Sequence, residues 1–158
     1  MVYAPAKTRI PWEDRFNRPS LHDLREHYNS QMSRLLDQAR ERLLSFEGAQ
    51  EEIAWEGVAW RWTFVYRLAN DPTRAWAYLV PHPENPRLAI PMTTPMVEAL
   101  PRRRLKKYIT EGVATAKRVG DIHWASWEVA NKTNLDEVLD LAKRKYKFIN
   151  ESAGGGRH

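Results

Sequence analysis

The amino-acid sequence predicts an α+β fold in which helices cover one antiparallel sheet. Three runs of alternating apolar residues follow one another between residues 58 and 92, and they read VAWRWTFVYRL, RAWAYLV and RLAIPM. A period of two is typical of strands that bury one face. Amphipathic helical patterns precede and follow these runs. Strands that are grouped together, with helices before and after them, favour α+β over an alternating α/β chain.

The length of 158 residues suits one domain with a sizeable core. We expect residues 1–19 to form an extended arm, residues 20–150 a single α+β domain and residues 151–158, with three consecutive glycines, a flexible tail. The arm carries Trp12, a large ring that we expect to anchor it to the body of the protein. Ile10 and Phe16 are further candidate anchors.

The composition excludes several classes of protein. Hydrophobic residues make up 42% of the chain and charged residues 28%, which excludes a disordered chain. No apolar run approaches the ~20 residues of a membrane span, and the first residues have no apolar segment typical of a secretory signal. The absence of cysteine excludes disulfides, thiolate nucleophiles and zinc–thiolate sites. These observations predict a cytoplasmic protein with no membrane partner.

Ser20 is predicted to cap a long N-terminal helix, with Asp23 in its first turn. Apolar residues then recur at steps of three and four from Leu21 to Leu44. This spacing predicts a single helix of roughly 25 residues over 21–45, with one buried stripe and a charged outer face.

The centre of the sheet is expected to be a three-stranded meander with one aromatic face. Trp76 and Tyr78 lie on the second strand, residues 69–73 have the chemistry of a hairpin turn, and the proline-rich residues 81–86 are expected to form a stiff loop. Residues 51–57 form either a further short strand or a loop that leads into the meander. The first run, taken as one strand, places these alternate residues on a common face: Val58, Trp60, Trp62, Phe64, Tyr66 and Leu68.

The last third of the chain adds helices and one more strand. Thr94, followed by proline, predicts a short helical turn, and the pattern over 101–120 predicts a helix. Residues 121–129 alternate as a strand, and Asn134 is predicted to cap a final helix that ends near residue 149. The expected sheet therefore has four to five strands, covered by the long N-terminal helix and two C-terminal helices.

Three stretches together resemble a known group of proteins: WRWTFVYRL…AWAYLVP, LPRRRLKKYITEGVATAKRVGDIHWASWEV and LDEVLDLAKRKYKFI. Over about residues 50–149 the chain resembles the small uncharacterised bacterial domains grouped as DUF3788 and, more distantly, the YdhG-like DUF1801 proteins. The resemblance implies a small α+β domain with helices packed on a sheet. It implies no established activity and no catalytic residue.

No motif of a common enzyme or cofactor-binding family is present, whether GxGxxG, P-loop, HExxH or GxSxG. His22 and His27 lie five residues apart, so they do not share a helix face as an i, i+4 metal pair would. We therefore predict no metal site, no cofactor and no catalytic residue. Glu56 and Glu128 are acid–base candidates if the protein is an enzyme, although nothing in the sequence brings them together.

The aromatic residues have two interpretations. The chain has seven tryptophans, which is more indole N–H groups than a core usually has to satisfy. In the first interpretation the rings are a core between sheet and helices. In the second, part of the set lines a concave pocket for a small apolar or planar ligand, with Arg61 on its rim. The candidate pocket residues are Trp60, Trp62, Tyr66, Trp76, Tyr78 and Trp124.

The basic residues also have two interpretations. The formal charge of +5 and the pI near 9.6 permit a polyanionic partner. One interpretation is a ridge that neutralises nucleic-acid phosphates, and the other is the solvated outer faces of two amphipathic helices. The residues of this candidate ridge are Arg102, Arg103, Arg104, Lys106, Lys107, Lys143 and Arg144.

From these features we expect a non-enzymatic domain that binds a small molecule or a partner protein through an aromatic pocket. The first alternative is a nucleic-acid-associated protein that uses the basic ridge. The second is an enzyme whose activity the sequence does not identify. Neither the ligand nor the oligomeric state follows from the sequence.

Overall fold

The computed structural model describes residues 10–155, with side chains described as far as Glu151, and it has an α+β fold. Within these residues six strands, where four to five were expected, form one antiparallel sheet in the order β1-β2-β3-β4-β6-β5. The segment before the meander is therefore a strand and not a loop. The strands are β1 (Ala49–Trp55), β2 (Trp62–Leu68), β3 (Asp71–Val80), β4 (Arg87–Thr93), β5 (Lys117–Val119) and β6 (Ile122–Glu128).

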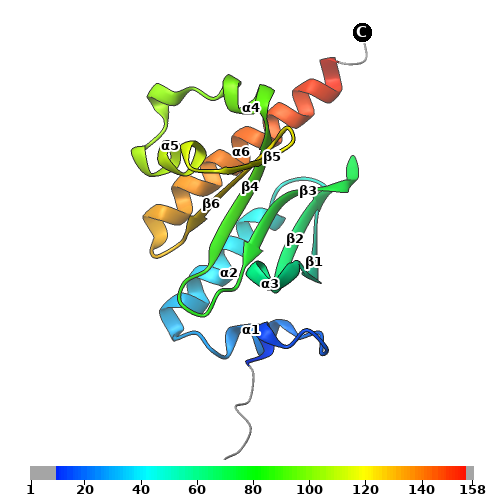
Figure 1. Cartoon of the computed structure of the whole chain (residues 1–158), viewed down its shortest axis with the longest axis vertical. Coiled ribbons are helices and arrows are strands. Elements are labelled where there is room, and N and C mark those ends of the chain that lie inside the picture. The colour runs from blue at the N-terminus through cyan, green and yellow to red at the C-terminus, as the bar shows by residue number, and fades with distance from the viewer. Residues whose placement is uncertain (1–9, 156–158) are drawn as a thin grey trace, which may run out of the picture.

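The helices lie mainly on one face of this sheet. In Figure 1, α2 and α6 pass behind the strands, whereas the short α3 lies in front of them. Within the described residues, no helix is long and apolar enough to cross a bilayer. The α-helices are α1 (Leu21–Arg25), α2 (Ser30–Leu44), α3 (Gly57–Trp60), α4 (Thr94–Ala99), α5 (Lys107–Ala114) and α6 (Lys132–Gly155), with 3₁₀ turns at Pro11–Glu13 and Arg102–Arg104.

The core lies between the sheet and the helices behind it. Phe64 pairs across strands with Leu79, Leu79 with Leu88, and Leu88 with Trp127, so these four side chains share one face from β2 to β6. All four are buried, and the guanidinium group of Arg40 on α2 lies over the Phe64 ring. Removing this apolar surface from water drives the packing of the helices onto the sheet.

The long N-terminal helix predicted over 21–45 is wrong, because the chain breaks between α1 and α2. The predicted Ser20 capping box is present on α1. Asn29 then caps α2 by accepting a hydrogen bond from the Met32 N–H at 2.8 Å. The break turns Tyr28 toward the loop after β3, where its hydroxyl donates to the His82 carbonyl. The helical periodicity of the sequence does not reveal this tertiary contact.

Trp12 anchors the segment before α1 to the body of the protein. Trp12 is 4% exposed and donates its indole N–H to the Trp60 carbonyl at 3.1 Å. Ile10 packs against the core, whereas Phe16 is 84% exposed, so its expected anchoring role is wrong. Residues 1–9 of the expected arm lie outside the described residues.

The first run of the meander is not one strand. Gly57 (φ +88°) turns the chain into α3, and β2 begins only at Trp62. Arg61 connects the two with φ +57°, a backbone conformation that is unfavourable for a side chain of this kind. Its guanidinium group compensates by pairing with Glu13 at 3.1 Å and lying over the Trp12 ring. Val58 and Trp60 therefore leave the predicted strand face.

The single helix predicted over 101–120 is also wrong. A 3₁₀ turn over 102–104 precedes α5, and residues 117–119 form β5 against β6. Gly120, with φ +60°, lies in the turn between these two strands and does not close a helix. The candidate ridge residues 102–107 therefore do not lie on one continuous helix.

The final helix differs from the predicted one at both ends. Asn131 caps it by accepting from the Asn134 N–H at 2.8 Å, so the predicted cap at Asn134 is three residues late. The helix continues to Gly155. The flexible tail predicted from residue 151 is thus helical over its first part, and residues 156–158 lie outside the described residues.

Candidate ligand-binding site

The sheet is split between β3 and β4. These strands pair only from Tyr78↔Ala89 to Val80↔Arg87, whereas β4 pairs with β6 along its whole length. Two local features end the β3–β4 ladder. Pro91 has no N–H to donate, and the β2–β3 register skips Trp76, which is typical of a bulge that bends a strand. Beyond this point the two strands separate.

Lys145 of α6 fills the point of separation. Its ammonium Nζ donates to the carbonyl of Trp76 on β3, at 2.8 Å, and to the carbonyl of Pro91 on β4. These two carbonyls face the split, where no opposite strand offers an N–H. A buried acceptor without a donor costs about 1–3 kcal/mol, so Lys145 stabilises both edges of the split sheet.

Burial changes the acidity of this group. Lys145 is 8% exposed, and the loss of hydration lowers the pKa of its ammonium to about 7, an effect that Asp71 partly opposes. A lysine with a pKa near neutrality exists partly as the free amine under ordinary conditions. It can therefore act as a hydrogen-bond donor, a proton acceptor or a nucleophile.

A cleft of about 740 Å³ opens at the split. Aromatic rings and aliphatic side chains form most of its wall, together with four charged side chains, Lys145, Arg74, Asp71 and Asp121, whose formal charges cancel. The remaining lining residues are Leu68, Thr73, Ala75, Trp76, Tyr78, Pro91, Thr93, Met96, Ile122, Trp124, Phe148 and Ile149.

Three aromatic rings meet on the front face of the sheet beside this cleft. The centroid of Trp60, carried by α3, lies 5.1 Å from that of Tyr78 and 5.9 Å from that of Trp124, and the Tyr78 and Trp124 centroids are 5.8 Å apart. Burial, with a smaller contribution from Glu56, raises the pKa of Tyr78. Burial also raises the pKa of Glu56, which Arg67 opposes. Each ring is only partly buried, so this cluster offers aromatic surface to a ligand.

The structure brings together part of the predicted aromatic set. Trp76, Tyr78 and Trp124 line the cleft, and Trp60 adjoins it through the ring contacts above. Trp62 and Tyr66 belong to the face packed against helices.

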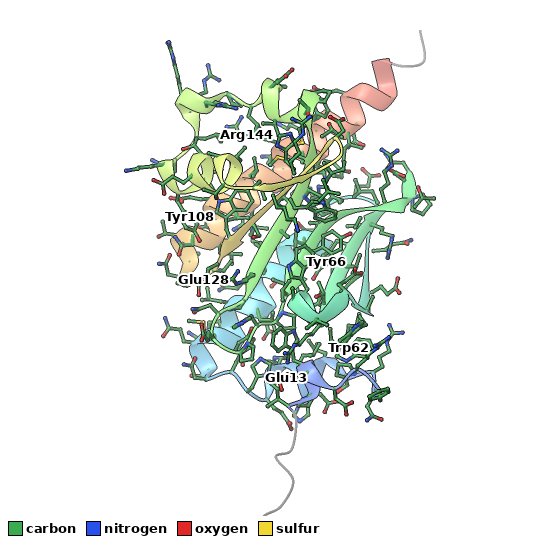
Figure 2. All side chains as sticks on the ribbon, viewed as in Figure 1. Glu13, Trp62, Tyr66, Tyr108, Glu128 and Arg144 are labelled. Atoms are coloured by element: carbon green, nitrogen blue, oxygen red, sulfur yellow. The ribbon has the colours of Figure 1, made fainter. Side chains whose placement is uncertain are left out.

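Trp62, Tyr66 and Arg61 have structural roles away from the cleft. Trp62 donates its indole N–H to the Asp14 carbonyl at 2.6 Å, and Figure 2 shows it near Glu13 at the α1 end of the molecule. The Tyr66 hydroxyl donates to Glu51 at 2.6 Å. Arg61 holds the N-terminal segment by pairing with Glu13 and by lying over the Trp12 ring.

Lys145 was not among the residues that the sequence singled out. Its neighbours Lys143 and Arg144 belong to the candidate basic ridge, and a basic residue near the end of a helix is usually solvated. A signal was present, because Leu141, Lys145 and Ile149 follow one another at steps of four residues. That spacing places Lys145 in the buried stripe of the helix.

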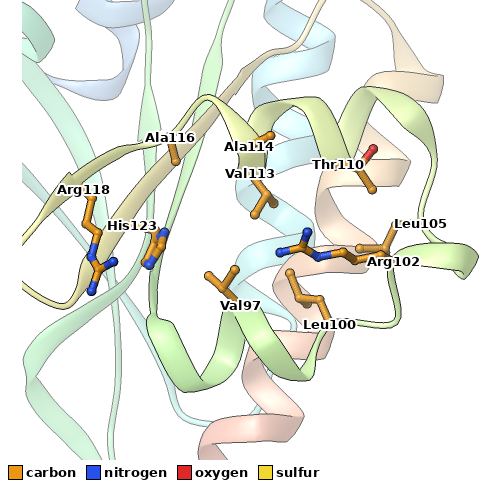
Figure 3. A pocket seen from close by; sticks show the side chains of 10 residues that line it. All are labelled: Val97, Leu100, Arg102, Leu105, Thr110, Val113, Ala114, Ala116, Arg118 and His123. Carbon is orange, nitrogen blue, oxygen red and sulfur yellow. The ribbon is translucent and has the colours of Figure 1, made fainter.

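A second, smaller hollow of about 350 Å³ lies between α4, α5 and the β5–β6 hairpin. Figure 3 shows Arg102 on one side of it and Arg118 with His123 on the other, with apolar side chains such as Val97 between them. The His123 Nε2 lies 3.0 Å from the Thr94 hydroxyl oxygen. This hollow has cationic edges and an apolar floor.

The candidate basic ridge is only partly neutralised. Lys107 pairs with Glu111 at 3.7 Å and Arg144 with Asp140 at 3.1 Å. Among the described residues, no ion pair involves residues 102–104 or Lys106, all of which are exposed. Nor do three or more histidine or acidic side chains gather anywhere in the described part of the chain to hold a metal.

Comparison with known proteins assigns no role to these sites. No protein-family model matches the chain, and a search of curated proteins found no relative. The resemblance to DUF3788 and YdhG-like DUF1801 domains stays a prediction.

Proposed function

We propose that this chain binds a small, planar, uncharged molecule with a carbonyl oxygen in the cleft between β3 and β4. The observation that carries the proposal is the placement of the Lys145 amine among aromatic rings at the point where the strands separate. Rings recognise a flat apolar body, and one polar group fixes its orientation. The cleft volume lies within the range of about 300–1,000 Å³ that is usual for small-molecule sites.

The charges of the lining favour a neutral ligand. The two cations, Lys145 and Arg74, are matched by Asp71 and Asp121. A strongly charged ligand would therefore meet repulsion from one pair while it gained attraction from the other. The carbonyls of Trp76 and Pro91 use two of the three donor positions of the Lys145 ammonium, so one donor remains for a ligand oxygen.

Binding of acetophenone tests this proposal, with ethylbenzene as a control of similar shape and no carbonyl. Because Trp76 and Trp124 line the cleft, we expect acetophenone to cause saturable NMR shifts of their indole N–H signals. One hydrogen bond contributes about 1 kcal/mol, so ethylbenzene should bind roughly fivefold more weakly. Equal binding of the two compounds would exclude a polar contact with Lys145, and the absence of saturable shifts would end the proposal.

A matched pair of variants locates the site. Trp124→Ala removes a ring of the cleft wall and should weaken acetophenone binding roughly tenfold. Trp55→Ala removes a half-buried ring that contacts Trp62 and lies outside the cleft, so it should leave the affinity unchanged. An equal loss in both variants would argue against the β3–β4 cleft.

We propose nucleic-acid binding by residues 102–104 as a second candidate function. The favouring observation is that these three consecutive arginines are exposed and have no ion-pair partner among the described residues. Unpaired guanidinium groups are available to phosphates. Arg118, across the smaller hollow from Arg102, adds a further cation near the same end.

Salt dependence tests this second function. Binding of a labelled duplex should weaken steeply with salt, and replacing Arg102, Arg103 and Arg104 by Gln should reduce the slope of log K against log[salt] by about 2–3, since each phosphate contact contributes about 0.9. The matched control replaces Arg15, Arg18 and Arg34, which are also exposed, and should keep the slope. Absence of binding at low salt would exclude this function.

A further inference from the structure

We propose that Lys145 captures an aromatic aldehyde in the β3–β4 cleft as a reversible imine, an inference that rests on the proposed function. It narrows the expected ligands from planar carbonyl compounds in general to aromatic aldehydes, whose carbonyl carbon an amine can attack. The cleft would then hold its ligand by a covalent bond that water can reverse.

The geometry suits an uncharged amine. A free lysine amine has two N–H bonds and one lone pair, and Lys145 has two backbone acceptors, the carbonyls of Trp76 and Pro91. With both N–H groups directed at these carbonyls, the lone pair is the one position of the nitrogen left over. Lys145 and both carbonyl-bearing residues line the cleft, so a ligand held there lies beside the nucleophile.

The surroundings favour the free amine as well. Burial lowers the pKa of the Lys145 ammonium to about 7, so a substantial fraction of the molecules carries the free amine at neutral pH. An ordinary exposed lysine, with a pKa near 10.4, is unprotonated in only about one molecule in 2,500. The charged groups that face the cleft are Asp71 and Arg74 from β3 and Asp121 from the β5–β6 turn, and of these Asp71 favours the ammonium form.

The step balances without a further reactant. The amine nitrogen attacks the aldehyde carbon, the carbonyl oxygen leaves as water with both amine hydrogens, and a C=N bond replaces the C=O bond. The neutral imine nitrogen has no hydrogen left, and uptake of one proton from the solvent gives the protonated imine, whose single N–H can donate to one of the two backbone carbonyls while the other carbonyl faces water in the cleft. The partly exposed rings of Tyr78, Trp124 and Phe148 line the cleft and would flank the conjugated plane of an aromatic imine.

The test is reductive trapping with salicylaldehyde on the full chain at pH 7. Cyanoborohydride converts an imine into a stable secondary amine, and peptide mass mapping then locates it. We expect Lys145 to be labelled at least tenfold faster than Lys143 and Lys147, its exposed neighbours on α6. Labelling of the exposed lysines with Lys145 unmodified would overturn the inference.

Two further measurements separate the causes of failure. Lys145→Arg keeps a donor for the two carbonyls but has no nucleophilic amine, so it should lose the fast label, whereas Lys143→Arg should keep it. If acetophenone binds but salicylaldehyde does not label Lys145, imine capture is excluded and the proposed function stands. If acetophenone does not bind either, the proposed function fails with it.

Discussion

Replacing Trp76 with alanine is expected to destabilise the protein by about 3–5 kcal/mol. Trp76 is 1% exposed and donates its indole N–H to the Ala142 carbonyl of α6 at 3.3 Å. Its ring centroid lies 4.8 Å from that of Phe46 and 6.0 Å from that of Tyr146. The substitution therefore removes a large packed ring and leaves a buried carbonyl without its donor, so the cavity term and the hydrogen-bond term act in the same direction.

Denaturant unfolding measures this effect. A loss of this size is a large part of the ~5–15 kcal/mol that stabilises a typical domain, so the midpoint should fall sharply or the variant should be unfolded at ambient temperature. Trp124→Ala is the matched control, because the Trp124 ring is only partly buried at the cleft and its removal should cost much less. Equal midpoints for Trp76→Ala and the unmodified chain would contradict the packing of α6 on β3.

The α+β class and the antiparallel meander could be predicted because both depend on periodicity. The alternation along β2 correctly placed Trp62, Phe64 and Tyr66 on one face of the strand, which pairs regularly with β1, and Arg40 of α2 lies over the Phe64 ring on that face. Trp76 is buried, and its indole N–H donates to the Ala142 carbonyl of α6. Trp62 is also buried, and its indole N–H donates to the Asp14 carbonyl of the N-terminal segment.

The interruptions could not be predicted, because tertiary contacts decide them. The sequence between α1 and α2 keeps a helical period, yet Tyr28 leaves it to reach the His82 carbonyl. The first meander run alternates in sequence from Val58 onward, yet residues 57–60 form α3 and β2 begins only at Trp62. Arg61 nevertheless takes a strained backbone conformation there, and its contacts with Glu13 and Trp12 offset the cost. A local pattern has no access to partners 48 or more residues away.

The candidate site could be predicted in its residue types but not in its position. An aromatic pocket was one interpretation of the tryptophans, and Trp76, Tyr78 and Trp124 do line a cleft. Which rings gather there depends on the bulge at Trp76 and on the missing donor of Pro91, which together open the sheet. Lys145 enters the site from α6 and acquires its chemistry only through burial between those strands.

Replacing Gly112 with alanine is the second substitution with a large expected effect on stability. We expect it to destabilise the protein, whereas a change from glycine to alanine inside a helix usually stabilises. Inside a helix, alanine is normally more stable than glycine by about 1 kcal/mol. Gly112 lies within α5, where a Cβ would come within 2.8 Å of Cζ2 of Trp127 and still closer to its Nε1. No ordinary packing accommodates such an overlap, so either the helix or the indole must move.

Trp127 has little freedom to move. It is 3% exposed, its indole N–H donates to the Tyr108 carbonyl at 3.1 Å, and it pairs across strands with the buried Leu88. Overpacking of a core typically costs about 1–3 kcal/mol, and displacement of the indole would add the loss of a buried hydrogen bond of about 1 kcal/mol. We therefore expect Gly112→Ala to destabilise the protein by about 2–4 kcal/mol in denaturant unfolding.

A double-mutant cycle distinguishes this overlap from any other effect of the alanine. In a Trp127→Leu background the indole atoms that meet the new Cβ are absent, so Gly112→Ala should there be neutral or stabilising by up to about 1 kcal/mol, its usual effect in a helix. The coupling between the two positions should thus be at least about 2 kcal/mol. An equal cost of Gly112→Ala in both backgrounds would show that α5 and β6 do not approach each other through this glycine.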